Sequence, residues 1–185
     1  DYAATGDAWH QVGTTPLMHI PIPWGASRFR LELDGHESLE FLSTGTGDLN
    51  VALDPIGSIP TGMVRVGGFA LVVDGDRLDI SDFLMDRYEV TNREYKGFVD
   101  AGGYERREFW QHDFVLEDVT IEWEDAMARF VDHTGRPGPS TWEVGSYPDG
   151  EDNHPVSGVS WYEAAAYAAF VGKDLPTVHH WRRAF

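Results

Sequence analysis

The fold is decided by residues 154–181, which read HPVSGVSWYEAAAYAAFVGKDLPTVHHW. Ser160 and Glu163 have the spacing of a capping box, in which each side chain accepts a hydrogen bond from the other residue's backbone N–H. A helix is therefore predicted to begin after Ser160. Gly172 is placed to adopt the left-handed conformation that ends a helix. The stretch thus predicts a capped helix with a sharp end, followed by a second helix that Thr177 can cap.

One face of this helix is expected to be buried. Its members recur at helical spacing and are apolar and mostly small: Trp161, Ala164, Ala165 and Ala168. Such positions lie on one side of a helix, and small side chains allow a neighbouring element to approach closely. We expect this face to pack inside a body that contains both helices and strands. On spacing alone, the same pattern fits an amphipathic helix of any α+β domain.

An earlier helix is predicted to begin after Thr91, with Glu94 completing a second capping box. Three side chains form its expected buried stripe: Tyr95, Phe98 and Val99. Gly102-Gly103 is expected to end this helix, because glycine adopts the left-handed conformation without a steric penalty.

Further elements follow from alternation, turn signals and helical spacing. Strands are predicted at Met63–Val66 and Ala70–Val73, and Asp74-Gly75 is typical of a hairpin turn. A helix is predicted from about Glu122 to Asp132, and a short strand at Trp142–Val144.

The N-terminal third is predicted to be all-β. Arg28–Leu33 alternates so that three apolar side chains share one face: Phe29, Leu31 and Leu33. His19–Pro23 carries two prolines, which suits only an edge strand. Asp54–Pro60 is rich in Pro, Gly and Ser and marks a boundary. We therefore expect a small all-β domain at residues 1–57 and a second domain at residues 58–185.

Composition excludes several classes of function. The net charge of −17 disfavours binding to nucleic acid and to anionic membrane surfaces, because both would be repelled. No apolar run approaches the ~20 residues that span a bilayer, so no membrane insertion is expected. The absence of cysteine rules out disulfides, thiolate metal sites and cysteine chemistry within the chain. The chain is expected to begin and end inside a longer natural protein.

Two stretches carry potential metal ligands. Asp149–Asn153 is rich in oxygen donors but lacks the ligand spacing of an EF-hand loop, which favours a solvated acidic turn. His179 and His180 would point about 100° apart on a helix, so they cannot chelate one ion together. His154 could approach them only through tertiary folding. We therefore predict no metal ligand and no catalytic residue in this chain.

Aromatic and charged residues mix between Tyr104 and Asp113. This stretch could form a recognition surface, or it could be a loop that its aromatic side chains pack onto the core. The candidate partner surface combines residues of this stretch with the two adjacent histidines: Tyr104, Arg106, Arg107, Phe109, Trp110, His179 and His180.

Two blocks of sequence resemble the formylglycine-generating enzyme family, the sulfatase-modifying factor domain. One block is residues 154–177, and the other joins Gly62–Val66 to Phe83–Tyr95. The resemblance implies the N-terminal half of a C-type-lectin-like fold, in which long ordered loops are common. The copper-binding cysteine pair and the calcium-binding loops of that family would lie beyond Phe185. No cofactor is therefore expected within this chain.

The resemblance fails at one place. The enzymes of this family commonly read Leu-Pro-Thr-Glu-Ala-Glu-Trp where this chain has LPTVHHW at residues 175–181. Two carboxylates are thereby lost, which leaves enzyme status open even for the parent protein.

The N-terminal residues resemble a PEGA-like β domain. The resemblance rests on Gly13–Leu17, on Pro23–Gly25 and on the strand Arg28–Leu33, which Asp34–His36 follows. His36 stands where an aromatic residue is usual. Bacterial domains of this kind often lie between a Ser/Thr kinase or a membrane anchor and an extracytoplasmic module. The parent is therefore expected to be a membrane-linked bacterial protein, with this chain on either side of the membrane.

Three functions remain open at this point. The chain could be a non-catalytic module that binds a peptide, a protein or other domains of its parent. It could be a fragment of an oxidase that converts sulfatase cysteine to formylglycine. It could also be a C-type-lectin-like scaffold that displays a variable ligand-binding surface.

Overall fold

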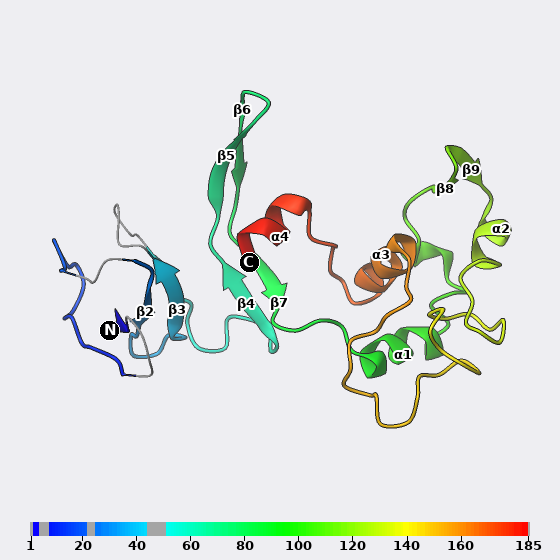
Figure 1. Ribbon diagram of the computed structural model, residues 1–185, viewed down its shortest axis with the longest axis horizontal. Helices are drawn as coiled ribbons and strands as arrows, with labels where there is room; N and C mark the ends of the chain where they lie inside the picture. Colours follow the sequence, from blue (N-terminus) through cyan, green and yellow to red (C-terminus); the bar gives the residue numbers. More distant parts are fainter. Residues whose placement is uncertain (1, 4–7, 22–24, 44–50, 185) are drawn as a thin grey trace. The chain divides into compact units, whose positions relative to one another are not determined.

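The structure is a computed structural model that describes residues 2–3, 8–21, 25–43 and 51–184. It contains small antiparallel sheets and few helices, which confirms the mixed α and β composition (Figure 1). Residue contacts divide the chain into two compact units. One comprises residues 1–65 and 83–85, and the other comprises residues 66–82 and 86–185.

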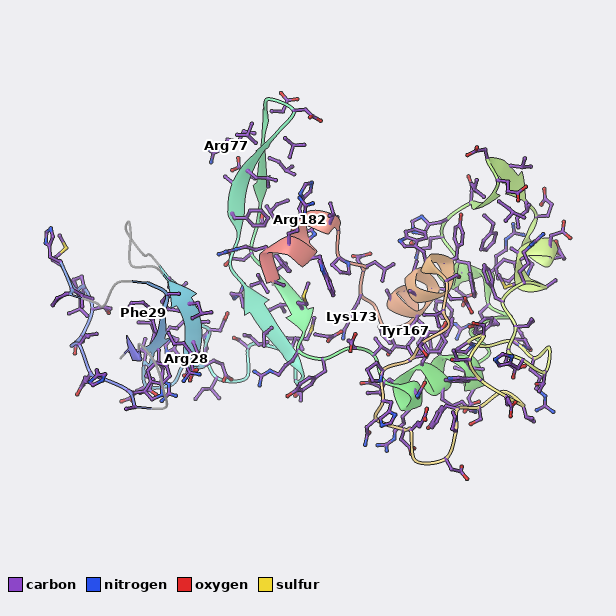
Figure 2. All side chains as sticks on the ribbon, in the orientation of Figure 1. Arg28, Phe29, Arg77, Tyr167, Lys173 and Arg182 are labelled. Atoms are coloured by element: carbon purple, nitrogen blue, oxygen red, sulfur yellow. The ribbon has the colours of Figure 1, made fainter. Side chains whose placement is uncertain are left out.

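The first unit contains a three-stranded antiparallel sheet in the order β1-β2-β3. The strands are β1 (Tyr2–Ala3), β2 (Ser27–Leu31) and β3 (Leu39–Ser43). Phe29 on β2 faces Phe41 on β3, and the two rings stack with centroids 5.6 Å apart, which stabilises this pair of strands. Figure 2 shows Arg28 and Phe29 on β2.

Two expectations for this unit are wrong. Leu33 lies outside β2 and is 56% exposed, so it does not continue the apolar face of Phe29 and Leu31. His19–Pro21 forms no strand, and His19 adopts a φ of 55°, which interrupts an extended chain. Residues 22 and 23 of that predicted strand lie outside the described residues.

Four strands lead toward the first helix. β4 (Met63–Val66) pairs with β7 (Phe83–Asp86), and β5 (Phe69–Val73) forms a hairpin with β6 (Asp76–Ile80). The turn at Asp74-Gly75 has φ values of 51° and 92°, as a two-residue hairpin turn requires. The predicted strands and turn are confirmed, whereas alternation had not identified β6 and β7.

Helix α1 (Asn92–Asp100) has the predicted caps. The backbone N–H of Thr91 donates to Glu94 Oε2 at 2.8 Å, and the N–H of Glu94 donates to Thr91 Oγ1 at 3.3 Å. At the other end, Gly102 has a φ of 75° and the N–H of Gly103 donates to the carbonyl of Phe98 at 2.9 Å. Residues close in sequence therefore supply the capping interactions at both ends of this helix.

Helix α3 (Trp161–Phe170) begins and ends as predicted. Ser160 and Glu163 form the capping box. Gly172 has a φ of 69°, and the N–H of Lys173 donates to the carbonyl of Ala168 at 2.8 Å. The left-handed glycine and the hydrogen bond from Lys173 back to Ala168 together form a Schellman motif, which ends the helix.

The expected buried face of α3 is wrong at Trp161, whereas Ala168 on the same predicted face is 7% exposed and therefore buried. Trp161 is 56% exposed, whereas Glu163 and Ala166 are the most deeply buried residues of the helix. The aromatic side chains of α3 that pack against the core are Tyr162, Tyr167 and Phe170. Large rings remove more apolar area from water than methyl groups do, so their side of the helix faces inward.

The segment between α1 and α3 differs most from expectation. It contains η1 (Arg107–Phe109), the hairpin β8 (Phe114–Leu116) and β9 (Val119–Ile121), and α2 (Trp123–Met127). Alternation had not revealed this hairpin.

Two predictions in this segment are corrected. The predicted helix to Asp132 is wrong, because α2 stops at Met127 and the Asp132 carboxylate instead binds N–H groups of a following loop. The predicted strand at Trp142–Val144 is also wrong. Trp142 is buried in the core, and Val144 has a φ of 54° inside a tight turn.

An aromatic core lies under these elements. Its buried members are Tyr95, Phe98, Tyr104, Trp110, Phe114, Ala126, Trp142 and Ala166. The last helix is α4 (Val178–Ala184). Among the described residues, no helix combines the length and apolar character that crossing a membrane would need.

Candidate functional site

A groove lies along the exposed side of α3, next to the segment that begins with η1. It encloses about 410 Å³. The lining residues come from η1 and the segment after it, from α3 and from the turn that ends α3: Phe109, Gln111, His112, Trp161, Ala165, Ala168, Ala169, Gly172, Lys173, Asp174 and Leu175. The lining combines apolar side chains with the polar or charged side chains of Gln111, His112, Lys173 and Asp174.

Trp161 dominates one end of the groove. The capping box places it at the first position of α3, where it remains 56% exposed. The His112 ring lies against its indole with centroids 4.7 Å apart. Ala165, Ala168 and Ala169 follow along the helix and have no side chain beyond Cβ, so the groove stays open where larger residues would fill it.

The other end of the groove holds two charged residues in succession. Lys173 Nζ lies 2.6 and 2.8 Å from the two carboxylate oxygens of Asp86, which fixes the ammonium group. Figure 2 shows Lys173 on the segment that leaves α3. Asp174 is exposed and makes no hydrogen bond or ion pair with another residue in the described part of the chain.

The stretch after α1 supplies only part of the surface predicted from sequence. Tyr104 and Trp110 are 5% and 7% exposed and belong to the core, as the alternative of a packed loop requires. Arg106 lies over the Phe109 ring at 4.6 Å and also pairs with Glu108. Phe109 lines the groove.

Arg107 is the remaining predicted surface residue of that stretch, and it lies outside the groove. Its guanidinium stacks over the Trp123 ring at 5.6 Å and is absent from the groove lining. Of the predicted residues in this stretch, therefore, the structure brings only Phe109 to the groove.

His179 and His180 are half-buried on α4. His180 takes the place of the capping-box glutamate: its Nδ1 accepts the N–H of Thr177 at 3.3 Å and lies 2.8 Å from Thr177 Oγ1. The N–H of His180 in turn donates to Thr177 Oγ1 at 3.3 Å. The lost carboxylate at this position is therefore replaced by an imidazole with a capping role.

A buried polar network supports α3 beneath the groove. Tyr104 donates to Glu163 Oε1 at 2.7 Å, and the Ser160 N–H donates to Oε2 at 2.7 Å. The hydroxyl of Tyr95 lies 3.1 Å from that of Tyr104. Burial raises the pKa of Glu163, although the hydrogen bonds from Ser160 and Tyr104 act to lower it.

The acidic loop Asp149–Asn153 supports α1 through its backbone. The Asn92 side chain donates to the carbonyl of Glu151 at 3.0 Å, and the Arg93 N–H donates to the carbonyl of Asp152 at 3.0 Å. The hydroxyl of Tyr147 donates to the Asp152 carboxylate at 3.2 Å.

The described residues contain no cluster of side chains of the kind that commonly binds a metal ion. No three or more His, Asp or Glu side chains converge there as a metal site. No chemical step is therefore assigned to copper or calcium within the described residues.

Sequence reasoning did not identify several of the residues that line the groove. His112 lies in the stretch Tyr104–Asp113 but was not among the predicted surface residues, Asp174 belongs to no motif, and Trp161 was predicted to lie in the core. One signal was present: the alanine run beside Trp161 leaves that face too small to bury the indole by itself.

The fold and the groove define a small α+β module with a recognition-sized cleft beside a capped helix. Residues 52–185 match the family described as the Sulfatase-modifying factor enzyme 1-like domain. This match covers most of the chain, which therefore belongs to that family, and it confirms the kinship predicted from the two sequence blocks.

Known relatives include enzymes of two kinds. The formylglycine-generating enzyme of Thermomonospora curvata is 34% identical over 69% of this chain and 47% of that protein. The formylglycine-generating enzyme of Mus musculus is 30% identical over 74% of this chain and 41% of that protein. The hercynine oxygenase of Mycolicibacterium thermoresistibile is 32% identical over 58% of this chain and 23% of that protein. The chain thus spans about half or less of the length of these relatives.

Proposed function

We propose that this chain is a non-catalytic recognition module of a larger protein and that it binds a peptide or protein segment in the groove beside α3. The observation that carries the proposal is the exposed indole of Trp161 at the end of an alanine-lined groove. Tryptophan is among the residues that contribute most to binding energy in protein interfaces. Because the indole is 56% exposed, much of its apolar area is left for a partner to bury.

Composition supports a binding role over a catalytic one. The chain contains no cysteine, so these 185 residues cannot carry out an oxidation that depends on a cysteine pair. We propose that any copper or calcium of the parent protein is held by residues outside this chain.

The finer architecture is part of the same proposal. The partial domain would have a C-type-lectin-like fold, and the N-terminal strands would form a PEGA-like β domain. A membrane-linked bacterial kinase parent agrees with one further relative, the serine/threonine-protein kinase pkn1 of Chlamydia caviae. That kinase is 30% identical over 55% of this chain and 14% of its own length.

The names of the relatives favour a second candidate function. Both the formylglycine-generating enzymes and the hercynine oxygenases are enzymes by name, so the chain could be one portion of an oxidising enzyme. In that case the groove would serve the substrate of the complete protein.

Two measurements test the proposal. A displayed peptide library is selected on the immobilised chain, and the selected peptides are then titrated against Trp161→Ala and Trp181→Ala. Trp181 is a matched control, because it is 53% exposed on α4. Binding should fall about tenfold or more in Trp161→Ala and remain in Trp181→Ala. Equal loss in both variants, or no selected peptide at all, would contradict the proposal.

The second measurement addresses catalysis. The chain is incubated with copper and a cysteine-containing sulfatase peptide, and the product is followed by mass spectrometry. We expect no formylglycine. Copper-dependent turnover by these residues alone would establish the enzymatic alternative.

A further inference from the structure

We infer that the His180 cap makes α4 a pH-sensitive helix, which is ordered while the imidazole is neutral and is destabilised when the imidazole is protonated. The capping boxes of α1 and α3 contain glutamates, Glu94 and Glu163, at the position that His180 occupies in α4. His180 lies outside the groove lining, so this behaviour does not depend on peptide binding by the groove.

The hydrogen bonds between Thr177 and His180 have the pattern of a capping box. The N–H of Thr177 donates to His180 Nδ1 at 3.3 Å, and the N–H of His180 donates to Thr177 Oγ1 at 3.3 Å. A histidine nitrogen accepts a hydrogen bond only when it carries no proton. The ring that caps α4 is therefore neutral, with its single proton on Nε2.

Protonation of His180 removes this acceptor. The new proton on Nδ1 would face the Thr177 N–H, so that two donors would meet across 3.3 Å. Thr177 Oγ1, 2.8 Å from Nδ1, could accept the new proton, but the Thr177 N–H would still lose its partner. The imidazolium would also add positive charge to the first turn of the helix, where the N-terminus is already partly positive. Histidine is the side chain whose charge changes between pH 5 and pH 8.

Helix α4 is short enough for one cap to matter. It has seven residues, whereas an isolated helix in water needs roughly 12–15. The bond that closes its first turn runs from the N–H of Trp181 to the carbonyl of Thr177 at 3.0 Å. Val178 and Trp181 are 56% and 53% exposed, so much of this end of the helix lies in water. Loss of a cap shifts a helix–coil equilibrium by about fivefold.

The far end of α4 connects the cap to the β5–β6 hairpin. Arg183 Nε donates to the carbonyl of Gly67 at 3.1 Å, and its guanidinium lies 5.8 Å from the centre of the Phe69 ring on β5. Once the first turn is lost, the residues that remain are too few to form a stable helix of their own. Acidification should therefore also weaken the contact between Arg183 and the hairpin.

Charged groups of both signs surround α4. Like charges disfavour a protonated imidazole, whereas carboxylates favour it. Those on α4 and on the elements before and beside it are His179, Arg182, Arg183, Lys173, Asp174, Asp76, Arg77, Asp79 and Asp82. Arg77 pairs with Asp79, and Asp82 accepts the N–H of Gly68. None of these groups can restore the acceptor that protonation of Nδ1 removes.

Amide hydrogen exchange, measured by NMR on the 185-residue chain, tests this pH dependence. Protection factors, which correct for the intrinsic effect of pH on exchange, are compared at pH 7.5 and pH 5. The Trp181 N–H should lose its protection about fivefold or more at pH 5. The Tyr95 N–H is the internal control, because it donates to the Thr91 carbonyl at the equivalent position of α1. Hydrogen bonds from Thr91 lower the pKa of Glu94, so that cap persists and Tyr95 should stay protected.

Three variants locate the effect. His180→Glu should keep Trp181 protected at both pH values, because a glutamate can cap at this position. His180→Ala removes the acceptor and should give low protection at both. His179→Gln, the matched control, should keep the pH response of the wild type. Equal protection of Trp181 at both pH values in the wild type would overturn the inference. A pH response that His180→Glu retains, or that His179→Gln abolishes, would overturn it as well.

Discussion

The Tyr104 hydroxyl donates a hydrogen bond of 2.7 Å to Glu163 Oε1, although 59 residues separate the two in sequence. The second carboxylate oxygen caps α3 through the N–H of Ser160. One side chain thus begins the helix and also attaches it to the loop that follows α1. This double role explains why a glutamate, 3% exposed, lies in the core of the unit.

Glu163→Gln should leave stability at neutral pH unchanged or raise it. The amide oxygen can accept the Ser160 N–H, the amide nitrogen can donate to Tyr104, and no charge has to be buried. Glu163→Ala is the comparison that removes both acceptors, and it should cost about 1–3 kcal/mol. Urea unfolding at pH 7 measures both variants. A Gln variant as unstable as the Ala variant would show that the ionised carboxylate is required.

The same carboxyl predicts a pH dependence. Because burial raises its pKa in the folded state, its contribution to stability is full below the unfolded value of 4.5 and is lost as pH rises through the folded pKa. The stability of the wild type relative to Glu163→Gln should therefore fall as pH rises above 4.5. A difference that stays constant from pH 4 to pH 8 would contradict this expectation.

The helix cap gives a simpler test. Ser160→Ala removes the acceptor of the Glu163 N–H and should lower the free energy of unfolding by about 1 kcal/mol. Ser157→Ala is the control, since Ser157 engages Thr141 through its backbone carbonyl and would keep that bond. Thermal unfolding measures the melting temperatures of both variants and of the wild type. An unchanged melting temperature for Ser160→Ala would mean that the hydroxyl does not stabilise α3.

Sequence reasoning succeeded where the determinants lie within a few residues of one another. The capping boxes at Thr91 and Ser160 and the turn at Asp74-Gly75 depend only on local chemistry. Side-chain spacing and backbone freedom specify such features before any tertiary contact forms.

Sequence reasoning failed where contacts between residues far apart in the chain determine the structure. The inward side of α3 is fixed by Tyr95 and Tyr104, which come from another part of the chain. Likewise α2 ends early because Asp132 binds a loop, and helical spacing cannot reveal that competition. The groove depends on how η1 packs beside α3, so its residues could not be found from motifs.

Asp132 should be the main acid-sensitive residue of the loop that follows α2. Burial acts to raise its pKa, but hydrogen bonds from Gly145, Thr134 and Arg136 outweigh burial and lower the pKa to about 2. The stabilisation is therefore present above the unfolded value of 3.8 and is lost as pH falls toward 2.

Asp132→Asn tests this role. The amide nitrogen would face the Gly145 N–H, a donor that now contacts Asp132 Oδ2 at 2.6 Å, so a loss of about 1–3 kcal/mol is expected at pH 7. The loss should shrink as the wild type is acidified from pH 4 to pH 2. A loss that is independent of pH would assign the effect to packing and not to the carboxylate charge.

Two glycines of α1 and its end should respond in opposite directions to the same substitution. A methyl group at Gly97 would meet nothing within 4 Å, so Gly97→Ala should stabilise α1 by about 0.5–1 kcal/mol through helix propensity. A methyl group at Gly103 would overlap the Phe98 ring, which is fully buried. Gly103→Ala should therefore cost about 1–3 kcal/mol, because a close-packed core cannot absorb the added volume. Urea unfolding of the two variants measures this contrast, and a Gly103→Ala variant as stable as the wild type or more stable would show that Gly103 does not pack against Phe98 in solution.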